Sequence, residues 1–193
     1  MSKNPKNLII YLVRHGRKDL KRFRKNSGEP CFLSKIGLQQ AGYLARKFEG
    51  ECIDKLISSD YERCVQTAEP ISKALGIPIN KDKGLRELSK EFRNLFWSGE
   101  GYEDREVKED ISRIKKSWDR IFNGSGKIVV VAHGGTNRVI MSLVLGIEPH
   151  MAKFGINPAG IIEIRVNENG KVGIRRSNDI SHLPESLREV QRE

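Results

Sequence analysis

The chain has 193 residues, of which 37% are hydrophobic and 31% charged, and its 35 Lys and Arg outnumber its 25 Asp and Glu. This balance excludes disordered, collagenous and coiled-coil proteins, and no apolar run approaches the ~20 residues that cross a bilayer. The formal net charge of +10 attracts anions of any kind, so it does not choose between phosphorylated metabolites, nucleic acid and an acidic surface.

The N-terminal residues and the cysteines indicate where the protein resides and what it does not bind. MSKNPKNLII lacks the apolar core and cleavage site of a signal peptide, so we expect a cytoplasmic protein without a membrane partner. Cys31, Cys52 and Cys64 are irregularly spaced, which predicts neither a metal site nor a disulfide framework. We therefore expect reduced thiols, no metal and no cofactor.

In the first half of the chain, the apolar run at residues 8–13 predicts a strand buried on both faces. Ser34 can cap a helix whose apolar residues fall on one face as far as Phe48. Lys55–Ser58 predicts a short strand, and Asp60 is expected to cap a second helix that ends at Gly76.

In the second half, residues 102–122 predict a charged surface helix, and residues 128–132 a second buried strand. A helix is expected at residues 136–145, and a hairpin from residues 160–166 and 171–176. Because strands and helices alternate, we predict one α/β domain over residues 1–193. It should be a three-layer sandwich, with helices on both faces of a mostly parallel sheet and an antiparallel edge.

The two clearest strands lead into polar, glycine-bearing turns. The first delivers Arg14, His15 and Gly16, and the other delivers His133 followed by Gly134. Ligands of open α/β sheets bind beyond the carboxyl ends of the strands, so both histidines should face a ligand. A neutral imidazole can attack phosphorus, a guanidinium can grip phosphate oxygens, and N–H groups at the helix start near Gly134 can bind an anion. Each of these residue types therefore has a use if the ligand is a phosphate ester, and no metal is required if the arginines carry the charge.

Six segments carry a family resemblance. They are LVRHG at 12–16, LSKIGLQQA at 33–41, SSDYERCVQTAEPI at 58–71, LRE at 85–87, VVAHGG at 130–135 and NDISHL at 178–183. Together they resemble the histidine phosphatase superfamily, in the branch of the cofactor-dependent phosphoglycerate mutases and their phosphatase relatives. The motifs stand in the family's order and extend over nearly the whole chain.

The resemblance implies a role for each matching residue. His15 would be the phosphorylated nucleophile, Arg14 and Arg63 the phosphate clamp, His133 the partner that completes the pocket, and Glu87 the general acid. From the residues alone, Arg63 at a helix start could be a solvated side chain, and an exposed carboxylate is the default for Glu87 in a charged stretch. His182 is expected to be a structural, hydrogen-bonding histidine.

Two departures from the family pattern bear on the substrate. Arg17 and Lys18 stand where family members commonly have an acidic or amide residue and a hydroxyl residue, and they open a basic run that includes Arg22. This run either recognises a second anionic group or is a solvated loop. The segment between Glu87 and His133 should hold a small lid insertion at roughly 88–122, whose Trp97 could line the substrate pocket or pack in the core.

A compact lid leaves a phosphoenzyme open to water, so we expect a phosphomonoesterase acting through phosphohistidine on a small phosphorylated metabolite. One alternative is phosphoryl transfer of the phosphoglycerate mutase type. Another is a catalytically idle domain that binds anions or nucleic acid, although basic residues without interleaved aromatics argue against a nucleic acid partner. The natural substrate and the oligomeric state remain open.

Overall fold

The computed structural model describes residues 7–20, 31–92, 95, 103–149 and 154–188. The strands of one six-stranded sheet are β1 (Leu8–Arg14), β2 (Lys55–Ser58), β3 (Ile79–Lys81), β4 (Gly126–Ala132), β5 (Ile161–Val166) and β6 (Val172–Asp179). Their spatial order is β3-β2-β4-β1-β5-β6, with the first four parallel to one another and β5 and β6 antiparallel to their neighbours. The predicted fold class, including the antiparallel edge, is confirmed.

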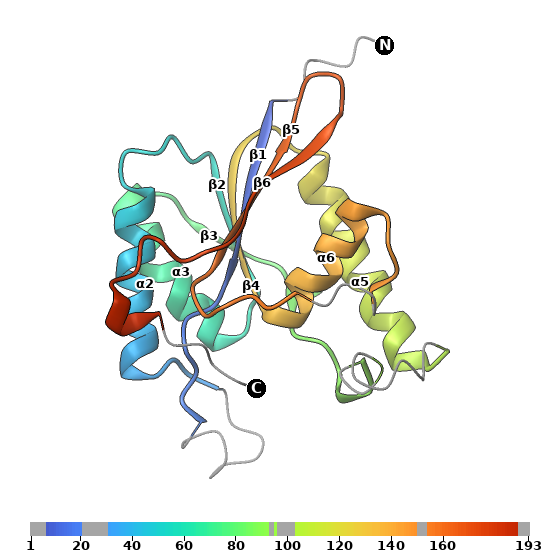
Figure 1. The fold of residues 1–193 in the computed structure, drawn as a ribbon, viewed down its shortest axis with the longest axis horizontal. Coiled ribbons are helices and arrows are strands. Elements are labelled where there is room, and N and C mark those ends of the chain that lie inside the picture. The colour runs from blue at the N-terminus through green and yellow to red at the C-terminus, as the bar shows by residue number, and fades with distance from the viewer. Residues whose placement is uncertain (1–6, 21–30, 93–94, 96–102, 150–153, 189–193) are drawn as a thin grey trace.

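Helices cover both faces of this sheet. The pair α2 (Lys35–Phe48) and α3 (Glu62–Leu75) lies on one face, and α5 (Arg105–Phe122) and α6 (Gly134–Leu145) lie on the other (Figure 1). Alternate residues of the central strands supply the two cores. Leu12 and Val130 belong to the cluster under α5 and α6, whereas Val13 and Val131 belong to the cluster under α2 and α3.

Helix α2 begins directly after Ser34, as predicted. The Ser34 hydroxyl caps it by accepting a hydrogen bond from the backbone N–H of Gly37 at 3.1 Å. The predicted cap at Asp60 is wrong. Helix α3 begins at Glu62 with Tyr61 as its N-cap residue, and the Asp60 carboxylate instead forms a bidentate ion pair with Arg86. The helix ends as predicted at Gly76, whose φ of 68° is left-handed.

Other boundaries differ from the prediction by two or three residues. Helix α5 begins at Arg105, and α6 begins at Gly134, two residues before the predicted start. Strand β3 was not predicted, because its three residues are largely exposed and show no apolar pattern. The early start of α6 matters for the site, since it places the helix N-terminus directly after His133.

The segment predicted as a lid, residues 88–122, contains helix α5, whose buried face packs Val107, Ile114 and Trp118 into the core beneath it. Residues 93–94 and 96–102 of the segment lie outside the described residues.

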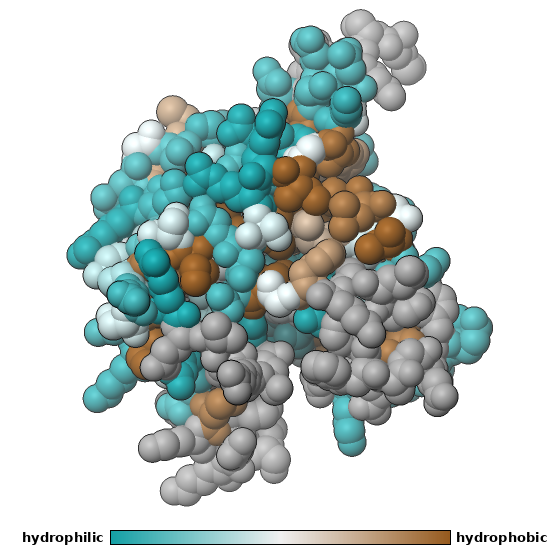
Figure 2. Space-filling view, in the orientation of Figure 1, coloured by the Kyte–Doolittle hydropathy of each residue, from teal (hydrophilic) through white to brown (hydrophobic). Residues whose placement is uncertain are grey.

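Among the described residues, few large apolar side chains are exposed. On the face in Figure 2, hydrophilic residues cover most of the α2 and α3 side, whereas hydrophobic residues gather over α6. Leu145 and Ile147, where α6 ends, are among the exposed large hydrophobic residues. Within the described ranges, none of the helices combines the length and the apolar character that a membrane crossing requires.

Candidate active site

The two predicted histidines meet where β1 and β4 end. These strands are parallel neighbours, with Arg14 opposite Ala132, so His15 and His133 are each the first residue beyond the paired segment. The backbone N–H of His15 donates to the carbonyl of Ala132 at 3.0 Å. The two imidazole rings are buried, and their centroids are 5.3 Å apart in an edge-to-face arrangement.

Hydrogen bonds fix the orientation of the His15 ring. Nδ1 lies 2.7 Å from the carbonyl oxygen of Gly16, which can only accept, so Nδ1 carries the proton. The other ring nitrogen, Nε2, accepts a hydrogen bond from Nε of Arg63 at 3.2 Å. Nε2 is therefore the nitrogen with an available electron pair, and it faces a guanidinium.

Burial and positive charge keep both rings neutral. The pKa of His15 lies well below its usual value because the ring is buried and because Arg63, Arg14 and Lys18 are nearby. The pKa of His133 is lowered in the same way by burial and then by Arg63 and His15. A neutral imidazole is the form that can act as a nucleophile.

Arg14 is held by the loop that precedes β5. Its guanidinium is buried, and Nη1 donates to the carbonyl of Ile156 at 2.5 Å. The next residue, Asn157, is tied down by its backbone N–H, which donates to Oδ1 of Asn178 at 2.7 Å. The NDISHL segment, residues 178–183, therefore has a structural role, because Asn178 supports the loop that orients Arg14.

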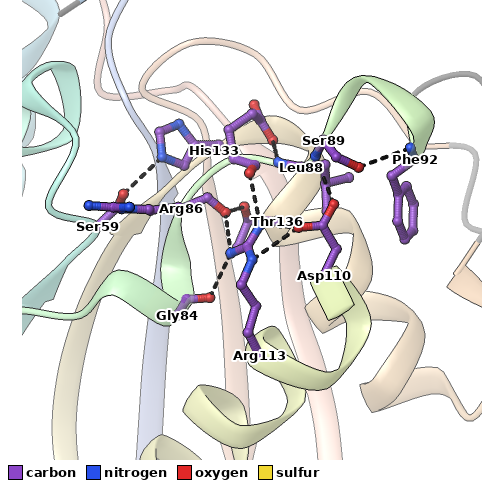
Figure 3. Close-up of polar contacts among 11 residues, drawn as sticks. Ser59, Gly84, Arg86, Leu88, Ser89, Phe92, Asp110, Arg113, His133 and Thr136 are labelled. Atoms are coloured by element: carbon purple, nitrogen blue, oxygen red, sulfur yellow. Dashed lines mark hydrogen bonds and ion pairs between the residues drawn. The ribbon is translucent and has the colours of Figure 1, made fainter. Parts of the chain in front are cut away.

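His133 has partners that the sequence analysis did not single out. Its Nε2 lies 2.9 Å from the hydroxyl of Ser59, and its ring is edge-to-face with Tyr61, at 5.4 Å between centroids. Figure 3 shows Ser59 and His133 side by side. The Arg63 guanidinium lies over the Tyr61 ring, 5.1 Å from its centroid. Ser59 and Tyr61 belong to the same motif, residues 58–71, as Arg63. Their position in that motif is the sequence signal that could have identified them as residues of the site.

Glu87 and Gly134 come together at the N-terminus of α6. Gly134 is the first residue of the helix and packs against the Arg14 side chain, since a Cβ at this position would lie 3.3 Å from Arg14 Nε. A Cβ on Gly135 would lie only 2.7 Å from Oε1 of Glu87, so the carboxylate rests against the helix start. Glu87 is partly buried, and Oε1 accepts from the backbone N–H of Leu88 at 3.0 Å.

Glycines allow α2 to approach the catalytic turn. A Cβ on Gly37 would lie 2.2 Å from the carbonyl oxygen of Arg17, and one on Gly16 would lie 2.6 Å from the carbonyl oxygen of Gly37. No side chain fits between these two backbones, which explains the glycines in both motifs.

The residues predicted for substrate specificity are less completely described. Arg17 and Lys18 are partly exposed beside the catalytic turn, and the charge of Lys18 reaches His15. Arg22 and Trp97 lie outside the described residues, so their roles stay predictions.

The structure does not support a hydrogen-bonding role for His182. Neither ring nitrogen has a hydrogen-bond partner, and burial lowers the pKa of this histidine to about 4. The ring is therefore packed as a neutral side chain. Among all the residues that the structure describes, no cluster of three or more His, Cys, Asp or Glu side chains could hold a metal ion.

Comparison with known proteins fits this arrangement. Residues 10–179 match the sequence profile of the histidine phosphatase superfamily, branch 1. The chain belongs to this superfamily. A protein of Hydrogenobacter thermophilus, named as a candidate phosphoserine phosphatase, is 30% identical over 90% of the chain and 96% of its own length. The superfamily comprises phosphatases and mutases, and this member is an enzyme of that phosphoryl-transferring type.

Solved structures share the fold of this histidine phosphatase superfamily member. Phosphoserine phosphatase of Entamoeba histolytica, solved with 3-phosphoglyceric acid, superposes with a TM-score of 0.74 at 22% identity over 92% of the chain and 100% of its own. Phosphoglycerate mutase of Bacillus anthracis gives a TM-score of 0.71 at 20% identity over 93% of the chain and 96% of its own.

Proposed function

We propose that the protein is a metal-independent phosphomonoesterase that acts through a phosphohistidine at His15. The observation that carries this proposal is the state of the His15 ring. Its Nδ1 proton is held by the Gly16 carbonyl, and its Nε2 electron pair points toward the Arg63 guanidinium, where a phosphate would bind. A buried, neutral and oriented imidazole beside a cation is suited to attack on phosphorus.

The reaction has two displacements at phosphorus. In the first, Nε2 of His15 bonds to phosphorus, the bond to the ester oxygen breaks, and the Glu87 carboxylic acid gives its proton to the leaving alkoxide. In the second, the Glu87 carboxylate takes a proton from water as the water oxygen bonds to phosphorus. The bond to Nε2 then breaks, and inorganic phosphate leaves with His15 restored.

Charges around the transferred group stabilise both transition states. Arg14 and Arg63 supply positive charge to it, and His133 can donate a hydrogen bond to an equatorial oxygen. The N–H groups at the start of α6, beginning with Gly134, add positive potential at the same place. No step of this scheme requires a metal ion or an organic cofactor.

Hydrolysis is preferred to mutase-type transfer for two reasons. The segment between Glu87 and His133 is short, which favours access of water to the phosphoenzyme. The relative from Hydrogenobacter, similar along nearly its full length, is named as a phosphatase. We propose a small phosphorylated metabolite as the class of substrate.

The proposal is tested with p-nitrophenyl phosphate and excess EDTA. We expect turnover that resists the chelator and that releases one inorganic phosphate per nitrophenolate. Loss of activity with EDTA, restored by a divalent cation, would refute the metal-independent mechanism. Stoichiometric transfer to an added phosphoglycerate in place of phosphate release would favour a mutase.

Replacing Glu87 with Gln should affect substrates according to their leaving groups. An alkoxide needs a proton as it departs, so we expect kcat/KM for an alkyl phosphate such as glycerol 2-phosphate to fall about 10²-fold. p-Nitrophenolate leaves without protonation, so its kcat/KM should fall less than about 5-fold. Steady-state kinetics on both substrates gives the ratio, and equal losses would remove Glu87 from the role of acid.

The double substitution Arg17→Ala with Lys18→Ala tests the basic turn. If these cations bind a second anionic group, KM should rise about 10-fold for substrates with two anionic groups and change little for p-nitrophenyl phosphate. The matched control is Lys55→Ala, an exposed cation of strand β2. An unchanged ranking of substrates would mean that the turn takes no part in substrate selection.

A further inference from the structure

The turn that carries Glu87 is fixed by one arginine from a distant part of the chain. Arg113, on α5, donates from Nη1 to the carbonyl oxygens of Gly84 and Arg86 at 3.0 and 2.7 Å, and from Nη2 to that of Glu87 at 2.8 Å. Figure 3 shows the Arg113 side chain extending from its helix toward this turn. One planar guanidinium therefore binds the carbonyl group of Glu87, the proposed acid, and those of two residues that precede it in the chain.

Asp110 orients the arginine and holds the far side of the same turn. Its Oδ1 accepts from Nε and Nη2 of Arg113 at 3.0 and 2.5 Å, and its Oδ2 accepts from the backbone N–H of Ser89 at 2.7 Å. Asp110 is buried, with 6% of its surface exposed. A buried ion pair contributes little net stability because both charges are desolvated, so the significance of this pair lies in the contacts that it orders.

A third contact ties the turn to the helix that begins at His133. The hydroxyl of Thr136, on α6, donates to the carbonyl oxygen of Arg86 at 2.9 Å. The close approach of Gly135 to the Glu87 carboxylate occurs at this same helix start. The backbone of the turn that carries Glu87 is thus held next to the helix start that follows His133.

We propose that Arg113 is the positioning residue of Glu87, holding the carboxylate where it can protonate the leaving oxygen. This proposal rests on the proposed function, because it assigns Arg113 to the acid step of that reaction. A general acid acts only within hydrogen-bond reach of the atom it protonates, and a displacement of about 1 Å can reduce the rate about 10²-fold. Lysine cannot replace the fork of a guanidinium, which binds several oxygens in one plane.

The experiment compares Arg113→Met and Arg113→Lys with the wild-type enzyme on glycerol 2-phosphate and p-nitrophenyl phosphate. We expect kcat/KM for the alkyl ester to fall about 30-fold or more in both variants, and for the aryl ester less than about 5-fold. Thr136→Val removes one hydrogen bond with little change of volume, so it should shift the ratio of the two rates in the same direction by a smaller factor. Arg105→Ala, which removes an exposed ion pair with Glu109 on the same helix, should leave both rates unchanged.

A double variant separates positioning from general destabilisation. Arg113→Met combined with Glu87→Gln should give the same ratio of kcat/KM for the aryl and alkyl esters as Glu87→Gln alone, because the arginine acts through the acid. Equal losses on the two substrates, or losses that add in the double variant, would overturn the proposal. Circular dichroism identifies a variant that does not fold. If Arg113→Met does not fold, the ratio of kcat/KM for the alkyl and aryl esters in Arg113→Lys and Thr136→Val decides whether the proposal holds.

Failure of the proposed function has a different signature. A wild-type enzyme that hydrolyses neither ester, or one whose activity survives His15→Ala, would overturn both proposals. If the wild-type activity depends on His15 but the ratio of rates is unchanged in the Arg113 variants, only the positioning role fails.

Discussion

His15→Ala is expected to reduce hydrolysis of p-nitrophenyl phosphate at least about 10³-fold and to abolish labelling of the protein by the substrate phosphoryl group. The ring is the protein nucleophile that attacks phosphorus in the first displacement, so its removal takes away the covalent route. The remaining cations still bind phosphate, and the KM or inhibition constant for phosphate should therefore change much less than kcat.

The measurement is a rapid quench in alkali with a ³²P-labelled substrate, because a phosphorus–nitrogen bond survives alkali and breaks in acid. His182→Ala is the matched control, since that ring is also neutral and partly buried but lies outside the site. The control should be labelled as the wild type is. Labelling of the His15→Ala protein to the wild-type extent would move the nucleophile elsewhere, and His133 would be the first residue to test.

The strand ends were predictable because the signals there are local. The apolar run before Arg14 marks a buried strand, and the second such run ends just before His133. Two parallel strands end at the same edge of a sheet, which brings the histidines together without any knowledge of side-chain packing. The same reasoning could not give the short and exposed strand β3, nor the start of α3, where Asp60 pairs with Arg86 rather than capping the helix.

The support of Glu87 could not be predicted, because it depends on contacts between distant segments. Arg113 belongs to a helix rich in exposed cations, and nothing in its local sequence distinguishes it from Arg105 or Lys116. Its contacts to Gly84, Arg86 and Glu87 span 26 to 29 positions of the chain. Only the docking of α5 beside the turn after β3 selects this arginine from its neighbours.

Arg63 combines two physical effects at His15, and substitution can separate them. It donates a hydrogen bond to Nε2, where a phosphate would bind, and its charge is the largest cause after burial that lowers the His15 pKa. Arg63→Met removes both effects, whereas Arg63→Lys keeps the charge and loses the planar fork. We expect kcat/KM for p-nitrophenyl phosphate to fall about 10²- to 10³-fold in the Met variant and nearly as far in the Lys variant.

The pH dependence should distinguish the two variants. His15 must be neutral to attack, so kcat/KM rises with pH as the ring loses its proton. The charge of Arg63 disfavours the protonated ring, and its removal raises the pKa of His15. The acidic limb of the pH profile should therefore move to higher pH in Arg63→Met and stay near the wild-type position in Arg63→Lys. Limbs that coincide in all three proteins would show that burial and the other nearby cations, Arg14 and Lys18, keep His15 neutral without Arg63, and would leave Arg63 with the phosphate contact only.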